Sequence, residues 1–264
     1  MAATSRLQHA LRTREQVWGG WVVGPTETAP EEFAAAGYDY VGFDVQHGYL
    51  SDADVARMLR RLERVPIATV VRLPGADAAP IGRVLDAGAD GVIIAMVESA
   101  EQAAAAVAAT VYPPAGVRSF GPLRADLGLD PGELASRVSV FAMVETAAGL
   151  AAIDDICAVP GLTGIYVGPA DLAISMGHPP VGALSQPQIR DAIVDVAGRA
   201  TAAGLVAGIH AGAGGAGNMM AQAGFHMVTL ASESQALRRG ITAHLDEARG
   251  DTSRPDAGSP KGYR

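Results

Sequence analysis

The stretch Ile67-Ala68-Thr69-Val70-Val71 (residues 67–71) decides the predicted fold, together with Gly91-Val92-Ile93-Ile94 at residues 91–94. Neither run alternates strictly between apolar and polar residues, so both faces of each predicted strand must be covered. Strands of this kind are typical of parallel sheets that lie between helices. The sequence therefore indicates an α/β protein.

Similar apolar runs recur along the chain and alternate with Ala-rich helical stretches. The predicted strands are Trp18–Val23, Tyr40–Val45, Ala68–Leu73, Gly91–Val97, Val138–Val144, Gly164–Val167, Val206–His210 and Met227–Leu230. The predicted helices include Asp52–Glu63, Ala78–Ala87, Ala100–Thr110, Leu150–Ala158, Pro187–Ala203 and Met219–Ala223. Eight strands with intervening helices predict a (β/α)8, or TIM, barrel. We expect residues 1–249 to form this single domain and residues 250–264, which are polar and rich in Pro and Gly, to be a disordered tail.

Composition narrows the class of protein. Hydrophobic residues make up 49% of the chain and charged residues 18%, which is enough to bury a large core. The net charge of -8 argues against a nucleic-acid surface, because phosphates require clustered Lys and Arg. The single cysteine, Cys157, excludes an intramolecular disulfide and a cysteine metal cage. With neither an apolar signal region nor a membrane-length apolar run, we expect a cytoplasmic protein without a membrane partner.

Polar residues gather at the carboxyl ends of the predicted strands, where TIM barrels place their active sites. Glu145 follows the fifth predicted strand and Asp171 follows the sixth. Two carboxylates that converge on one mouth, completed by water and substrate, would suit a hard divalent cation. Carboxylates also favour helix N-termini, so each of these two residues could instead cap the helix that follows it. From these residues alone, a metal site and a pair of helix caps remain open alternatives.

His47 and Arg72 lie at the same predicted mouth. His47 follows Asp44 at a strand end, which suits a general base oriented by a carboxylate, although a loop histidine is more often structural or solvated. Arg72 closes an apolar strand, where an unpaired guanidinium would be unfavourable. It therefore either pairs with a carboxylate or binds an anionic substrate, and its position favours the substrate.

A glycine-rich run from Gly212 to Gly217 matches the G-x-G-x-x-G fingerprint, with Glu233 21 residues beyond Gly212. Too little chain follows it to build a dinucleotide-binding fold, and we expect no nicotinamide cofactor. In a barrel, this loop after the seventh strand is a usual place for phosphate or carboxylate contacts. It would then hold the distal end of a substrate.

Several sequence blocks keep the order found in one known family from about residue 15 to residue 180. The blocks are Trp21, residues 37–48 (GYDYVGFDVQHG), Arg72, residues 85–91 (LDAGADG), residues 112–118 (YPPAGVR), Glu145-Thr146 and residues 168–173 (GPADLA). In this order the chain resembles the HpcH/HpaI aldolases, which are class II, metal-dependent pyruvate aldolases. The resemblance implies an oligomeric barrel, with a hexamer as one form, and an aldolase of the 4-hydroxy-2-oxoheptanedioate or 2-keto-3-deoxy sugar acid type.

The resemblance also implies residue roles. Glu145 and Asp171 would be ligands of Mg²⁺, Mn²⁺ or Co²⁺, and Arg72 would steady an enolate oxygen. The implied acid/base is His47, oriented by Asp86. Trp21 would help to form the wall of the pocket. The backbone amides at Gly168 and Ala170 would bind the pyruvate carboxylate.

These roles predict reversible cleavage of a 4-hydroxy-2-oxo acid to pyruvate and an aldehyde through an enolate. The single lysine of the chain, Lys261, lies in the tail, which argues against a Schiff-base aldolase. Two alternatives remain: a citrate lyase β-like or acyl-CoA lyase, and a barrel that binds a small molecule without turnover. The chain departs from the family pattern at Gln46, Ala95 and Met143, which bears on the choice of aldehyde.

Overall fold

A computed structural model of the protein describes residues 4–250. Eight parallel strands form a closed barrel in which each strand pairs with the next along the chain and β8 pairs with β1. The strands are β1 (Val17–Val22), β2 (Tyr40–Asp44), β3 (Ala68–Leu73), β4 (Gly91–Ile94), β5 (Ser139–Val144), β6 (Gly164–Val167), β7 (Val206–His210) and β8 (Met227–Ser232). The predicted (β/α)8 barrel is confirmed.

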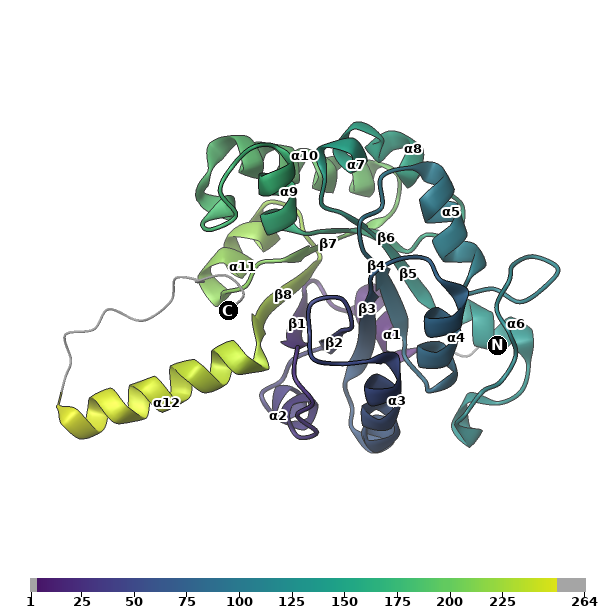
Figure 1. Ribbon diagram of the computed structural model, residues 1–264, viewed down its shortest axis with the longest axis horizontal. Coiled ribbons are helices and arrows are strands. Elements are labelled where there is room, and N and C mark those ends of the chain that lie inside the picture. The colour runs from purple at the N-terminus through teal and green to yellow at the C-terminus, as the bar shows by residue number, and fades with distance from the viewer. Residues whose placement is uncertain (1–3, 251–264) are drawn as a thin grey trace.

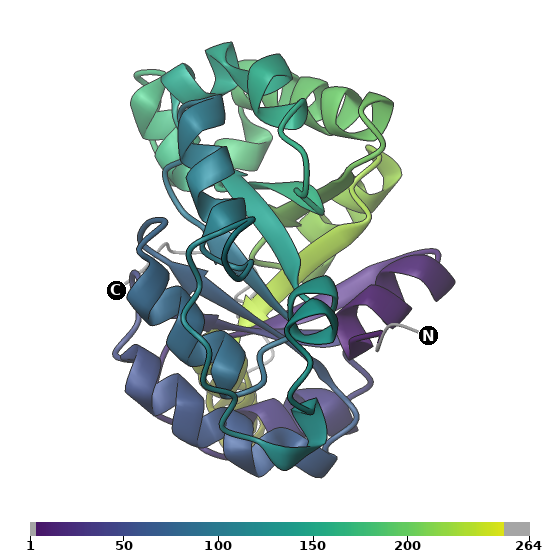
Figure 2. The ribbon, with the colours of Figure 1, turned by 90° about the vertical axis from the view of Figure 1, so that its right-hand side faces the viewer.

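Helices surround the strands, and Figure 2 shows the blue and the green helices on opposite sides of them. The α-helices are α1 (Arg6–Thr13), α2 (Ala29–Ala35), α3 (Asp52–Arg61), α4 (Ala78–Asp86), α5 (Ala100–Ala108), α6 (Pro131–Ser136), α7 (Ala147–Ala151), α8 (Ile153–Cys157), α9 (Pro169–Ser175), α10 (Pro187–Ala202), α11 (Gly214–Gln222) and α12 (Glu233–Arg249). Short 3-10 helices span Leu62–Arg64, Ala125–Leu127 and Ala183–Ser185. No helix within residues 4–250 is long and apolar enough to cross a membrane.

The strands separate two apolar cores. The outer core lies between strands and helices and contains most of the buried Val, Ile, Leu and Ala side chains. The inner core fills the barrel with large side chains, among them Trp21, Tyr40 and Tyr166. Gly42 makes room for this packing, because a Cβ there would lie 2.2 Å from the Trp21 ring. The barrel is thus a packed interior, and its chemistry must take place at an end.

The observed helices differ from the predicted ones in two places. The predicted helix Leu150–Ala158 is two short helices, α7 and α8, which meet at Ala152. The predicted Met219–Ala223 helix begins earlier, at Gly214, although glycine has a low helix propensity. There Gly217 packs tightly, since a Cβ would lie 2.2 Å from Leu230, so tertiary contacts override the local preference.

Helix α12 leaves the ring of helices and extends away from the barrel (Figure 1). None of its residues is buried. It ends at Gly250, whose left-handed backbone (φ 67°) suits a helix C-cap. Apart from this residue, the predicted tail lies outside the described part of the chain.

Candidate active site

Two neighbouring strands bring a buried ion pair to the carboxyl end of the barrel. Asp44 of β2 lies in register with Arg72 of β3. Arg72 donates two hydrogen bonds to Asp44, from Nε at 3.0 Å and from Nη2 at 2.5 Å. Burial raises the pKa of Asp44, but the hydrogen bonds and charge of Arg72 outweigh burial and hold that pKa below its usual range. The carboxylate therefore stays ionised and fixes the guanidinium group.

The Trp21 side chain completes the support of this pair. Its indole N–H donates to Asp44 Oδ2 at 3.2 Å, and its ring lies 5.6 Å from the guanidinium carbon of Arg72. His210, the last residue of β7, packs edge-on against Trp21, with the ring centroids 5.3 Å apart. Burial, and then the charge of Arg72, lower the pKa of His210 to about 4. His210 is therefore neutral near pH 7 and adds no competing charge beside Arg72.

Glu145 follows β5 and is only 1% exposed. Its Oε1 atom accepts a hydrogen bond from the Met96 backbone N–H at 3.0 Å, while Oε2 has no partner among the described residues. Burial, with a smaller contribution from the nearby carboxyl group of Asp171, raises the pKa of Glu145 to about 7 despite the opposing Met96 N–H and the charge of Arg72. The helix that follows is capped by the Thr146 hydroxyl, which accepts from Gly149 N–H, so Glu145 is not its cap.

Asp171 lies in the first turn of α9, which begins directly after Gly168. A Cβ at Gly168 would lie 2.4 Å from Glu145 Oε2, so only glycine allows the carboxylate this position. The Gly168 N–H donates to the Val144 carbonyl at 3.4 Å. Ala170 is the second residue of the helix, and the N–H groups of a first turn lack intrahelical acceptors. Of the two predicted amides, Ala170 is therefore the better placed to bind an anion.

The donor set fits a hard divalent cation. A buried carboxylate oxygen without a partner, beside a second carboxylate, is unfavourable unless a cation or proton joins them. Oxygen donors match Mg²⁺ and Mn²⁺. No cluster of three or more His, Cys, Asp or Glu side chains suited to a metal occurs within residues 4–250. Glu145 and Asp171 would thus supply the protein ligands, with the other positions left to substrate and water.

His47 and Asp86 lie at different ends of the barrel. His47 is exposed in the loop after β2, where its backbone N–H donates to Asp44 Oδ1 at 3.0 Å. Asp86 is the last residue of α4, which leads to the amino end of β4, and its carboxylate pairs with Arg118 at 2.8 Å. Within one chain Asp86 therefore does not orient His47, contrary to our expectation. The pairing stays a prediction that only a contact between two chains would satisfy.

Two residues at the mouth, Glu233 and Met96, had no role in the predicted aldolase site. Glu233 Oε1 accepts the backbone N–H groups of Val23 and Gly24 at 2.9 and 2.7 Å, and its Oε2 is buried without a partner in the described chain. Met96 has a left-handed backbone (φ 57°), rare for a side-chain-bearing residue, and this backbone donates to Glu145. The position of Glu233 directly after a strand was an available signal, whereas a φ value is not readable from sequence.

The glycine run after β7 leads into α11, with Gly212 at φ 71° and the helix beginning at Gly214. A closed barrel has no crevice of the kind that an open doubly wound sheet offers a dinucleotide. The fingerprint match therefore lacks the structural context that it requires.

The comparisons with known proteins agree with this geometry. The family model for HpcH/HpaI aldolase/citrate lyase matches residues 18–239. The chain belongs to this family. It is 37% identical over 233 residues to a hydroxypyruvate/pyruvate aldolase of Rhizorhabdus wittichii, covering 87% of this chain and 93% of that protein. It is 38% identical over 205 residues to a 4-hydroxy-2-oxovalerate aldolase of Novosphingobium aromaticivorans, covering 76% and 78%.

Solved structures show the same fold. A crystal structure of an HpcH/HpaI aldolase/citrate lyase family protein from Burkholderia cenocepacia has a TM-score of 0.85 and 31% identity, covering 93% of this chain and all of that one. The predicted family and enzyme class, an aldolase acting as a carbon–carbon lyase, are confirmed.

Proposed function

We propose that the protein reversibly cleaves a 4-hydroxy-2-oxo acid to pyruvate and an aldehyde, with Mg²⁺, Mn²⁺ or Co²⁺ as cofactor. The observation that carries this proposal is the unpartnered Oε2 of buried Glu145 beside Asp171. Relatives named hydroxypyruvate/pyruvate aldolase and 4-hydroxy-2-oxovalerate aldolase support the substrate class.

The proposed roles of the cation, Arg72 and the Ala170 amide follow from their charges. When bound by Glu145 and Asp171, a divalent cation supplies Lewis-acid stabilisation of the negative charge that develops in cleavage. Arg72 adds a fixed positive charge on the same mouth, and its two hydrogen bonds to Asp44 hold it in place before substrate arrives. A charge fixed in advance requires little reorganisation in the transition state. The Ala170 backbone N–H donates a hydrogen bond to the pyruvate carboxylate in this proposal.

His47 is the proposed acid/base. In cleavage a base takes the proton of the C4 hydroxyl as the C3–C4 bond breaks and the aldehyde leaves, and the enolate is then protonated to pyruvate. A histidine suits this task because its ordinary pKa lies near neutral pH. His47 lies in the exposed loop directly after Asp44, at the end of the barrel that carries Arg72.

The test is pyruvate release from a panel of 4-hydroxy-2-oxo acids, with Mg²⁺, Mn²⁺, Co²⁺ or a chelator. We expect activity that the chelator abolishes and added metal restores. Cleavage that proceeds undiminished after complete metal removal would contradict the proposal. The His47→Ala variant separates the alternatives: severe loss supports the aldolase, whereas nearly unchanged cleavage supports a citrate lyase β-like or acyl-CoA lyase. Binding of pyruvate without turnover would indicate a non-enzymatic barrel.

We also propose that the protein is a homo-oligomer assembled through α12. Leu237, Ile241 and Leu245 are 66%, 58% and 47% exposed, and their four-residue spacing puts them on one face of the helix. A second copy of the chain would bury this apolar row. Light scattering of Ile241→Asp should then give a smaller particle than the unmodified protein, and an unchanged mass would count against this interface. Whether the form is a hexamer, and whether it works in the cytoplasm, stay predictions.

A further inference from the structure

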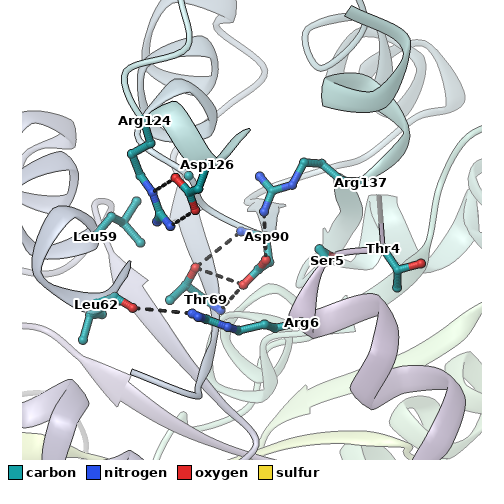
Figure 3. A pocket seen from close by; sticks show the side chains of 11 residues that line it. Thr4, Ser5, Arg6, Leu59, Leu62, Thr69, Asp90, Arg124, Asp126 and Arg137 are labelled. Carbon is teal, nitrogen blue, oxygen red and sulfur yellow. Dashed lines mark hydrogen bonds and ion pairs between the residues drawn. The ribbon is translucent and has the colours of Figure 1, made fainter. Parts of the chain in front are cut away.

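A polar cavity lies at the amino end of the barrel, at the opposite end from the proposed active site. Its volume is about 140 Å³. Thr69 at the start of β3 and Asp90 just before β4 form part of its wall, and Arg137 enters it from the segment before β5. Arg6, the first residue of α1, closes another side (Figure 3). The catalytic mouth is formed by the opposite ends of these strands.

Three arginines and two aspartates line this cavity, so its formal charge is +1. Asp90 Oδ2 accepts from the Thr69 backbone N–H at 2.9 Å and from its hydroxyl at 3.3 Å. Arg137 reaches Asp90 Oδ1 only at a long 3.3 Å. Asp90 therefore has two neutral donors and neutralises Arg137 through one weak contact.

Arg6 carries the excess charge. It donates to the Leu62 and Glu63 carbonyls at 3.4 and 2.9 Å, and it forms no ion pair with any residue in the described range 4–250. A carbonyl oxygen satisfies an N–H group but does not cancel the positive charge of the guanidinium. Arg6 is exposed at the cavity, and its charge acts on Asp90 only from beyond ion-pair distance. The cavity thus presents a cation that forms no ion pair within residues 4–250.

The third arginine, Arg124, is held in place by Asp126 and by close packing against Gly88. Arg124 forms two hydrogen bonds with Asp126, at 3.0 and 2.5 Å. It packs against Gly88, where a Cβ would lie 2.6 Å from Nη1, and Gly88 has the positive φ of 103° that favours glycine. Asp126 is 44% exposed at the rim, so Arg124 is a prepositioned donor whose partner solvent already screens.

We propose that this cavity binds a small oxyanion, namely phosphate, between the guanidinium groups of Arg6, Arg124 and Arg137. Guanidinium groups match phosphate oxygens through charge-assisted hydrogen bonds. Liquid water occupies about 30 Å³ per molecule, so the cavity can hold an anion of several heavy atoms. The phosphate can be free or part of a small phosphomonoester. This inference does not depend on the aldolase reaction.

The experiment is thermal unfolding and titration calorimetry of the full chain with inorganic phosphate and, separately, glycerol phosphate. Chloride at matched ionic strength controls for screening. Ligand that binds the folded state raises the unfolding temperature with concentration. We expect stabilisation by inorganic phosphate beyond that of chloride. Equal stabilisation by glycerol phosphate shows that the cavity accepts a phosphomonoester as well as free phosphate, and its absence restricts the cavity to free phosphate.

Variants locate the site. Arg6→Gln should weaken phosphate binding about tenfold, and it leaves no buried carboxylate without a partner because, among the described residues, Arg6 bonds only to carbonyl oxygens. The control, Arg199→Gln on α10, should leave phosphate binding unchanged. Asp126→Asn removes a competing anion from the rim and should tighten binding, an effect that a merely structural role would not produce. Binding should persist in Arg72→Lys. The inference is overturned if phosphate acts no better than chloride, if Arg6→Gln binds it normally, or if Arg72→Lys abolishes binding.

Discussion

The two ends of the barrel use the same residue types in different ways. At the carboxyl end, Arg72 donates two hydrogen bonds to the Asp44 carboxylate, and the indole N–H of Trp21 donates a third. At the amino end, Arg137 meets Asp90 at one distance of 3.3 Å, because Thr69 already satisfies the other carboxylate oxygen. An arginine–aspartate pair is therefore rigid or loose according to what else the aspartate binds.

Two other buried carboxyl groups, Glu145 at the carboxyl end and Asp90 at the amino end, differ in how many hydrogen-bond partners they have. Burial is the main cause that raises the pKa of both Glu145 and Asp90. Both Asp90 oxygens accept hydrogen bonds, whereas Glu145 Oε2 has no partner in the described part of the chain. The unsatisfied oxygen supports the cation proposed at the carboxyl end, and the satisfied carboxylate of Asp90 fits a structural position.

The largest expected effect comes from loosening the rigid pair. Arg72→Lys keeps the charge but loses the two-point contact with Asp44, so kcat/KM should fall by about a hundredfold or more. The matched change at the other end, Arg137→Lys, should alter kcat/KM less than about threefold, since no substrate lies there. Pyruvate release under identical metal concentration measures both. Equal losses in the two variants would show that the ends do not differ in this way.

A smaller effect is expected from filling the space beside Glu145. In Gly168→Ala the new Cβ would lie 2.4 Å from Oε2, so the carboxylate must move and metal affinity should fall by about tenfold to a hundredfold. Gly198→Ala on α10 is the control, because no atom lies within 4 Å of its Cβ position, and it should stabilise the helix by up to about 1 kcal/mol. Metal titration and thermal unfolding measure the two outcomes. Unchanged metal affinity in Gly168→Ala would argue against Glu145 as a ligand.

A further effect concerns how the stability of the metal-free protein depends on pH. The pKa of Glu145 is about 7 when folded and 4.5 as a reference, so the unfolded chain releases this proton first. Between these pH values the unfolded state binds fewer protons, and the free energy of unfolding falls as pH rises, by at most about 3 kcal/mol.

Glu145→Gln should lack this decline. The lowered pKa of His210 acts in the opposite direction, since the unfolded state then binds more protons below its ordinary pKa. The difference in unfolding free energy between the two proteins, measured by denaturant titration with chelator from pH 5 to pH 7, removes the contribution of His210. A constant difference across this pH range would show that the pKa of Glu145 is not raised in the folded protein.

Local sequence was enough to predict much of the fold. Three strands have the predicted bounds, Ala68–Leu73, Gly164–Val167 and Val206–His210, and each is a short apolar run between clear boundaries. Helix α12 was not among the predicted helices, and its apolar row of Leu237, Ile241 and Leu245 is not packed on the barrel, since none of its residues is buried. The helix between residues 150 and 158 was predicted as continuous, since a change of backbone angle at Ala152 has no sequence signal.

The sequence by itself determined the barrel, because apolar runs covered on both faces require this layering, and it predicted the end at which we propose the chemistry, because strand ends set the positions of Glu145 and Asp171. Only the tertiary structure decided which side chains pair with one another. It joined Asp44 to Arg72 through strand register, and it placed Asp86 at the end opposite His47. Contacts between distant residues depend on register, barrel closure and side-chain packing, none of which a local pattern encodes.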